Sequence, residues 1–220
     1  MYYKTVMTRL IMILTFLGLT TGMKAQQETG TWSITPRAGV NSSNVSVEDL
    51  WVLGNTDKSY KAKRKWGFVA GMDAEYQAGQ QIGISVGAFY SNEGYTYGNV
   101  EDLGKVTQTL HFLNIPILAN FYVEPNILPG LALKAGVQFG YLMKADMKDG
   151  LGEYSQGNNT KNFKRVNISI PAGISYCYKH FVADIRYNIG LMNLCDVELE
   201  VEDSWKTNSL WLTVGYQFKL

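Results

Sequence analysis

The sequence predicts an all-β fold, an eight-stranded antiparallel up-and-down transmembrane β-barrel, on three observations. Apolar side chains alternate with small or polar ones along several segments, as in residues 131–143, where every odd position is apolar. The connections between these segments are alternately short and long, and an export signal precedes them. Strands with an apolar outer face and a polar inner face, joined in this way, are typical of bacterial outer-membrane barrels.

The first 25 residues are predicted to be a cleavable signal peptide, followed by one β-barrel domain over residues 26–220. Lys4 and Arg9 precede the uncharged run 10–23, and cleavage is expected after Ala25. No cysteine follows this run, so no lipoprotein anchor is expected. Without residues 1–25 the chain keeps 17 of its 20 basic residues and all 19 acidic residues, which gives a net charge of about −2. No basic excess remains for nucleic acid phosphates, so nucleic acid is not an expected partner.

The period of two places eight strands along the mature chain. Each is long enough to cross a bilayer at the usual tilt, which takes roughly 9 to 11 residues. After the signal, no apolar run reaches the length of a helical membrane span. The predicted strands are 31–41, 65–77, 81–92, 107–123, 130–144, 164–179, 181–192 and 207–220.

The lengths of the connections predict the orientation of the barrel. Short links are expected at 78–80, at 124–129 and near His180, and long links at 42–64, 93–106, 145–163 and 193–206. Outer-membrane barrels have short periplasmic turns and long external loops, so both termini are expected in the periplasm. A soluble eight-stranded barrel of the lipocalin type is the remaining alternative.

Glycine, proline and aromatic residues are arranged as a small barrel requires. Ten glycines fall on the inner faces, where small residues relieve crowding, and aromatic residues fall on the outer faces near strand ends. Pro116 and Pro171 fall on inner faces within strands, and because proline removes a ladder hydrogen bond we expect bulges there. The inward glycines are Gly39, Gly67, Gly71, Gly83, Gly87, Gly136, Gly140, Gly173, Gly190 and Gly215.

The inner faces also carry charged residues of both signs. The interior of an eight-stranded barrel is about filled by side chains, so these groups are expected to pair with one another and plug the lumen. A narrow ion path or a ligand pocket is the alternative. The predicted cluster is Arg37, Asp73, Glu75, Lys134, Asp184 and Arg186, with Asn114, Asn120, Gln138 and Asn167 beside them.

Two segments resemble a known family. Leu110-His-Phe-Leu-Asn-Ile-Pro-Ile-Leu-Ala-Asn-Phe-Tyr122 is similar to the Ile-Pro-Leu-Leu strand of the PorT-like outer-membrane β-barrel family common in Bacteroidetes, a porin-family-like group. Trp32-Ser-Ile-Thr-Pro-Arg-Ala-Gly-Val-Asn41 resembles the opening strand of that family. The resemblance covers essentially the whole mature chain and implies the barrel and the outer membrane. The founding member serves a secretion system, so secretion-system proteins are implied as partners.

The C-terminus carries a second, separate resemblance. Thr213, Gly215, Phe218 and Leu220 are spaced like the β-signal that the barrel-assembly machinery reads. That machinery is therefore an expected partner during biogenesis. An ordinary closing strand would produce part of the same pattern by its alternation alone.

Catalytic and metal chemistry have little support. A lipid-modifying enzyme would need His180 beside an outward nucleophile, but Ser169 and Ser175 project inward, and His111 lies near the other barrel end. Cys177 and Cys195 are expected at opposite barrel ends, without disulfide or zinc partners. The acidic run 196–203 has oxygen ligands for calcium but fits a solvated hairpin arm better. We therefore expect no enzyme, no cofactor and no metal.

The sequence thus favours a non-enzymatic integral outer-membrane barrel with a plugged interior. Its role would be structural or associated with assembly or secretion, acting through loops and turns. The alternatives are a narrow porin-like channel or small-ligand transporter and, last, a lipid-modifying enzyme. Outer-membrane lipid and lipopolysaccharide are expected partners, with a basic cluster placed to touch lipopolysaccharide phosphates. That cluster is Lys58, Lys61, Lys63, Arg64 and Lys65.

Overall fold

The computed structural model describes residues 28–46, 62–100, 104–124, 126–148, 155–156, 160–194 and 205–220. The predicted signal peptide, Lys58, Lys61, Cys195 and the acidic run 196–203 lie outside the described residues. No helix within these ranges is long and apolar enough to cross a membrane.

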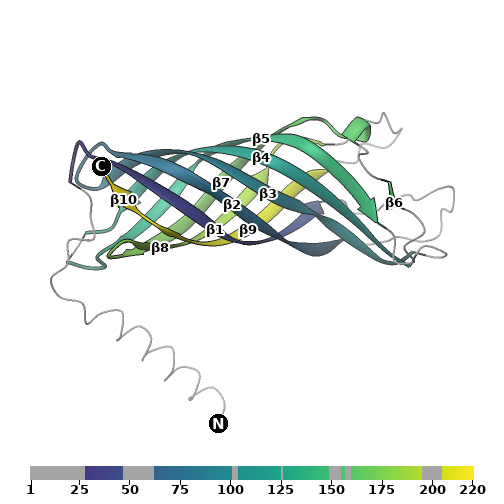
Figure 1. The fold of residues 1–220 in the computed structure, drawn as a ribbon, viewed down its shortest axis with the longest axis horizontal. Helices are drawn as coiled ribbons and strands as arrows, with labels where there is room; N and C mark the ends of the chain where they lie inside the picture. Colours follow the sequence, from purple (N-terminus) through teal and green to yellow (C-terminus); the bar gives the residue numbers. More distant parts are fainter. Residues whose placement is uncertain are drawn as a thin grey trace, which may run out of the picture.

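The regular structure of the described residues is almost entirely strand, because most long segments alternate side chains between two faces. Figure 1 shows the strands running obliquely along the long axis, with β10 at one end and β6 at the other. The elements are β1 (Trp32–Ser46), β2 (Lys63–Gln77), β3 (Ile82–Val100), β4 (Gly104–Tyr122), β5 (Leu131–Lys148), β6 (Ser155–Gln156), the 3-10 turn η1 (Thr160–Asn162), β7 (Val166–Tyr178), β8 (Phe181–Gly190), β9 (Lys206–Tyr216) and β10 (Phe218–Lys219).

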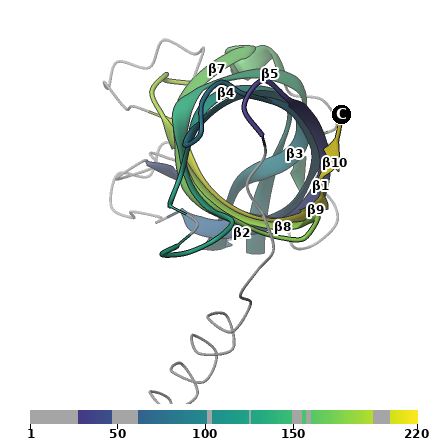
Figure 2. The same ribbon diagram turned by 90° about the vertical axis from the view of Figure 1, so that its left-hand side faces the viewer.

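The strands close into a barrel. Each long strand pairs antiparallel with its neighbour in sequence, and β9 pairs with β1 to complete the ring seen in Figure 2. β10 continues β9 and pairs with β1 in the same register. The two strands are separated only at Gln217, next to Pro36 of β1, because proline has no N–H to donate to the ladder. Over the described residues the wall is therefore eight-stranded and closed, which confirms the predicted fold.

The register fixes how strongly the strands are staggered. A path of paired residues that starts at Trp32 in β1 and crosses every strand returns to β1 at Ser42, ten residues further on. A stagger of this kind forces the strands to tilt against the barrel axis and sets the width of an eight-stranded barrel. The interior is therefore narrow enough for side chains to fill it.

Large apolar side chains cover the outer wall, and we call them the apolar belt. Trp66 is 66% exposed and Val214 is 67% exposed, which a water-soluble surface would not tolerate in such numbers. Every long strand contributes; examples are Ile34, Met72, Ile84, Ile117, Val137, Ile174, Ile185 and Val214. We call the end with the short turns and both barrel termini the turn end, and the opposite end the loop end.

The strands run further at the loop end than the sequence pattern predicts. β1 continues to Ser46, and β3 and β4 pair until Val100 and Gly104, so the predicted loop 93–106 is mostly a hairpin. That loop prediction was wrong because the outward residues beyond the apolar belt, such as Asn92 and Thr109, are polar, so the apolar alternation ends there. The backbone pairing of β3 with β4 nevertheless continues.

The expected bulges at Pro116 and Pro171 are also absent from the described strands. Pro116 is buried and faces inward, yet the register on both sides of it is the same, and the same holds for Pro171. Each proline only interrupts the ladder locally. The register shifts lie instead at the loop end, between Arg64 and Val69, between Tyr97 and Val100, and between His111 and Phe112.

Candidate functional site: a lumen closed at two levels

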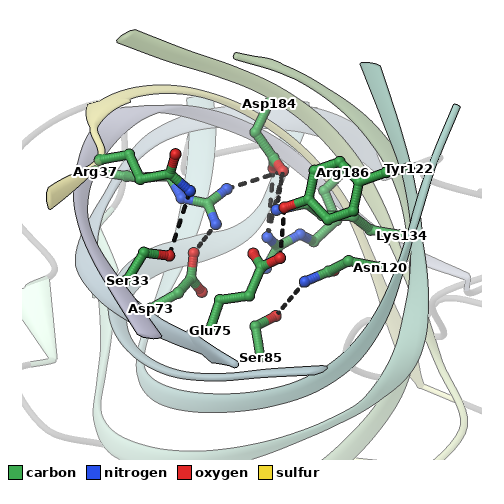
Figure 3. Close-up of polar contacts among 11 residues, drawn as sticks. Ser33, Arg37, Asp73, Glu75, Ser85, Asn120, Tyr122, Lys134, Asp184 and Arg186 are labelled. Atoms are coloured by element: carbon green, nitrogen blue, oxygen red, sulfur yellow. Dashed lines mark hydrogen bonds and ion pairs between the residues drawn. The ribbon is translucent and has the colours of Figure 1, made fainter. Parts of the chain in front are cut away.

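The six charged residues predicted for the interior all lie inside the barrel. Arg37, Asp73, Glu75, Lys134, Asp184 and Arg186 are 2–6% exposed and come from β1, β2, β5 and β8. Figure 3 shows their side chains pointing toward one another from the surrounding strands. Three cations face three carboxylates, so the cluster is balanced in charge, as a group buried away from water must be.

Asp184 is the centre of this ion network. Its Oδ2 lies 2.9 Å from Arg37 Nη1 and 3.9 Å from Lys134 Nζ, and its Oδ1 lies 3.4 Å from Arg186 Nη2. Arg37 also pairs with Asp73 on the neighbouring strand β2. Because the partners come from four strands, the network ties opposite parts of the wall together across the lumen.

Glu75 has a partner that the sequence analysis did not identify. Tyr122, at the end of β4, donates its phenol hydrogen to Glu75 Oε1, and both side chains are buried. Asn120 on the same strand donates to Ser85 Oγ at 3.1 Å. Tyr122 is on the same face of β4 as Leu118 and Asn120, so the sequence pattern could predict that it faces inward. Its pairing with Glu75 depends on the tertiary structure.

A row of amides leads from the ion network toward the loop end. Gln138 Nε2 donates to Asn114 Oδ1 at 3.2 Å, and Asn114 Nδ2 donates to Ser91 Oγ at 2.9 Å. Ser91 in turn donates to Glu93 Oε1 at 3.0 Å. Polar groups in an enclosed space are stabilised by such partners, which offset the cost of leaving water.

Glu93 lies inside the barrel, although its position was predicted to open a loop. Its Oε1 accepts hydrogen bonds from Ser209 Oγ at 3.3 Å and from Trp211 Nε1 at 3.2 Å. Both donors are on β9, so Glu93 links β3 to β9 across the lumen. Phe89, Ser91 and Glu93 are alternate residues on the inner face of β3. This alternation could have predicted that Glu93 faces inward.

An aromatic layer lies between the ion network and the loop end. The rings of Phe89 and Trp211 lie 5.8 Å apart, and the guanidinium of Arg186 lies 5.9 Å and 5.8 Å from their centroids. Gly71 leaves the space for this layer, since a Cβ there would lie 2.7 Å from the Phe89 ring. The cation thus joins the charged and the aromatic parts of the interior.

Beyond this layer the interior of the loop end is apolar. One cluster contains Leu110, Phe112, Leu142, Ala145, Phe163 and Leu194, and a second contains Val45, Tyr95, Tyr97 and Val106. Trp205 packs against both clusters. The barrel is therefore filled by ion pairs in the half toward the turn end and by packed apolar side chains at the loop end, and we call the latter the apolar plug.

The structure does not bring the predicted catalytic candidates together. Ser169 and Ser175 are buried inside the barrel, while His180 is exposed in the β7–β8 turn and stacks on Tyr216 with centroids 5.3 Å apart. Cys177 is a buried free thiol. Within the described ranges, no three His, Cys, Asp or Glu side chains gather as a metal site.

The residues that resemble an assembly signal occupy both faces of the last strand. Thr213 and Gly215 face inward, and a Cβ on Gly215 would lie 2.5 Å from Arg37 Cγ, so glycine leaves room for that arginine. Phe218 and Leu220 are 52% and 74% exposed on the outside. The lipid-facing surface of the closing strand is therefore apolar up to its last residue.

Comparison with known proteins agrees with this architecture. Residues 24–196, well over half of the chain, match the family model of the outer membrane protein beta-barrel domain. The chain belongs to that family. Its members are outer-membrane barrels, and the outer membrane is the location of this protein. No curated protein matches the sequence.

Solved structures share the fold at low sequence identity. Neisserial surface protein A matches at 13% identity and a TM-score of 0.50, over 85% of this chain and 97% of that one. OprG from Pseudomonas aeruginosa matches at 14% identity and 0.48, over 89% and 99%. Ail from Yersinia pestis, solved with a heparin analogue, matches at 18% identity and 0.46, over 87% and 100%. These similarities concern the barrel fold alone.

Proposed function

We propose that this protein is a sealed, non-enzymatic barrel that works through its surfaces and not through its lumen. The observation that carries the proposal is the closure at two levels, by the ion network around Asp184 and by the apolar plug. A charge-balanced network removes the net field that would attract an ion, and a packed apolar layer excludes water. The role we infer is structural, or associated with assembly or secretion, through the external loops and the periplasmic turns.

Several finer features belong to this proposal. The turn end would face the periplasm and the loop end the exterior, after removal of residues 1–25. The PorT-like resemblance favours secretion-system proteins as partners, and the surrounding partners would be outer-membrane lipid and lipopolysaccharide. The barrel-assembly machinery would read Thr213, Gly215, Phe218 and Leu220 during insertion. Ser169 and Ser175 are buried inside the barrel and do not face the outer wall, which supports a non-enzymatic role.

Crosslinking in intact cells, followed by mild detergent extraction, tests the role at the surface. We expect a stoichiometric partner set to co-purify with the barrel, and crosslinks from the loops or turns to name the surface that binds it. A monodisperse barrel that never co-purifies with another protein would contradict the assembly or secretion role.

A narrow channel is the second candidate, and one observation favours it. Arg186 Nε and the amide oxygens of Gln138 and Asn167 are buried without a protein partner among the described residues. Such groups are normally satisfied by ordered water, so the polar half of the lumen is suited to hold some.

Conductance in planar bilayers separates the two candidates. A sealed barrel gives no conductance above background, whereas a channel gives a conductance that changes when Arg37 or Lys134 is replaced. A general outer-membrane porin in the same bilayers is the positive control, because removing the aromatic layer alone would leave the ion network and the apolar plug in place. Conductance in the unmodified protein would overturn the sealed barrel.

A further inference from the structure

The outer wall at the loop end carries basic residues directly beyond the apolar belt. The exposed apolar residue Trp66 on β2 is followed toward the loop end by Arg64, and Met143 on β5 by Lys144. Val166 on β7 is preceded in the chain by the exposed Lys164 and Arg165. The mature chain as a whole is slightly acidic, so this arrangement is not a result of composition. Cations at this height meet the headgroups of membrane lipids.

The basic residues on β4, on β5 and just before β7 lie on adjacent segments, and we call this surface the rim patch. His111 pairs in register with Lys144, and Leu142 N donates to Arg165 O at 2.7 Å, so the three strands are adjacent here. The rim patch consists of His111, Lys144, Asp146, Lys164 and Arg165.

A bulge aims Lys144 outward. The register shifts by one residue between His111–Lys144 and Phe112–Leu142, which leaves Met143 as an extra residue and exposes both Met143 and Lys144. Bulges of this kind turn a side chain to a new direction. Met143 therefore stays in the apolar belt, while the ammonium of Lys144 is held above it.

Neighbouring side chains fix the direction of this ammonium group. Asp146 Oδ2 lies 2.8 Å from Lys144 Nζ and 3.3 Å from His111 Nε2. Tyr90 OH lies 2.5 Å from His111 Nδ1 on the other side of the ring. The Lys144 side chain nevertheless remains 54% exposed, so its remaining donors are open to a ligand.

Lys164 and Arg165 supply charge that this carboxylate does not neutralise. Both are exposed, and no acidic side chain of the described residues forms an ion pair with either. Among the described residues, the rim patch therefore holds three cations and one carboxylate, and that carboxylate pairs with Lys144. The surface below them is apolar, with Leu113, Tyr141, Met143 and Val166 each 39–49% exposed.

We propose that the rim patch binds the phosphate of a phosphorylated lipid headgroup in the leaflet at the loop end. The phosphate would lie against Lys144, Lys164 and Arg165, and the acyl chains would lie along the apolar residues below. This site rests on the outer-membrane location and the exterior loop end of the proposed function, but it does not depend on a sealed lumen, since its three cations are exposed at the rim. It also differs from the basic cluster expected from the sequence, in which Arg64 donates to Ser42 and is thereby tied to β1.

Lipid titration of the purified full-length barrel in detergent tests this site. The probe is bisphosphorylated lipid A, with dephosphorylated lipid A as the comparison, and binding is followed by native mass spectrometry. Lys164→Gln with Arg165→Gln should weaken binding of the phosphorylated probe roughly 25-fold, because each cation near an anionic surface contributes about fivefold. Lys144→Gln alone should weaken it about fivefold.

Lys179→Gln with Lys219→Gln is the matched control, since it removes two exposed cations at the turn end. This control should bind within about twofold of the unmodified protein, and gel mobility before and after heating checks that every variant is folded. Equal binding by the unmodified protein and the Lys164/Arg165 variant would overturn the site. Displacement by an equal concentration of inorganic phosphate would show a simple anion site and overturn the lipid assignment.

Discussion

The two halves of the lumen are enclosed by the same strands but filled by opposite chemistry. In the half toward the turn end, Asp184 holds Arg37, Lys134 and Arg186 in a buried ion network. At the loop end, Leu110, Phe112 and Leu142 pack as in the core of a soluble protein. The outer wall differs in the opposite sense: it is apolar around the ion network and polar around the apolar plug, at residues such as Asn92 and Thr109.

The comparison shows two ways to fill a narrow barrel, and substitutions destabilise them for different reasons. A buried ion network depends on every partner, because removing one leaves an uncompensated charge. An apolar plug depends on volume, because removing a side chain leaves a cavity. Arg186 lies between the two, paired with Asp184 on one side and stacked near Phe89 and Trp211 on the other.

Removing the centre of the ion network should have the largest effect. Asp184→Ala leaves three cations facing two carboxylates, and we expect the free energy of unfolding to fall by about 3–5 kcal/mol. Urea titration in lipid vesicles measures it. Asp146→Asn at the rim is the control and should cost less than about 1 kcal/mol. Equal effects at the two positions would contradict the dependence on a buried network.

Removing volume from the apolar plug should have the next largest effect. Leu142 is fully buried, and Leu142→Ala should lower the free energy of unfolding by about 3 kcal/mol through the cavity it leaves. The same urea titration applies, with exposed Leu128→Ala as the control. A loss below about 1 kcal/mol would mean that the plug is loosely packed.

The hydrogen bond from Tyr122 to Glu75 should contribute less. Tyr122→Phe removes the donor and leaves the ring, so we expect a loss of about 2 kcal/mol, as for a hydrogen bond to a charged group. Tyr97→Phe is the matched control, because the buried Tyr97 hydroxyl has no partner among the described residues. If both substitutions cost the same, the Glu75 contact does not stabilise the barrel.

The link between Glu93 and β9 should give the smallest effect. Glu93→Gln keeps an oxygen acceptor for Ser209 and Trp211 but removes the charge, so we expect a loss of about 1 kcal/mol. Exposed Glu124→Gln is the control. A more stable Glu93→Gln barrel would show that burying this carboxylate costs more than its hydrogen bonds return.

Particular residues show where sequence reasoning succeeds and where it stops. Arg37, Asp73 and Asp184 could be assigned to the interior because strand alternation determines the face of each side chain. Their pairing could not be assigned, because it depends on the stagger of ten residues around the barrel. Glu93 was missed because the outward residues beside it are polar, and the strand was therefore ended too early.

The apolar plug and the rim patch illustrate the same limit. Phe163 and Trp205 lie outside the predicted strands, and only the closed barrel brings them against Leu142 and Tyr95. Lys144 was the last residue of a predicted strand, and only the bulge at Met143 turns it outward above the apolar belt.

The sequence by itself determined the barrel, its strand number and which side chains face the lumen, because a period of two is a local property of the backbone. The tertiary structure alone decided which inward residues meet, how far the strands extend beyond the apolar belt and where the lumen changes from charged to apolar. Those features depend on closure of β9 onto β1 and on the register around the ring, and no single strand contains that information.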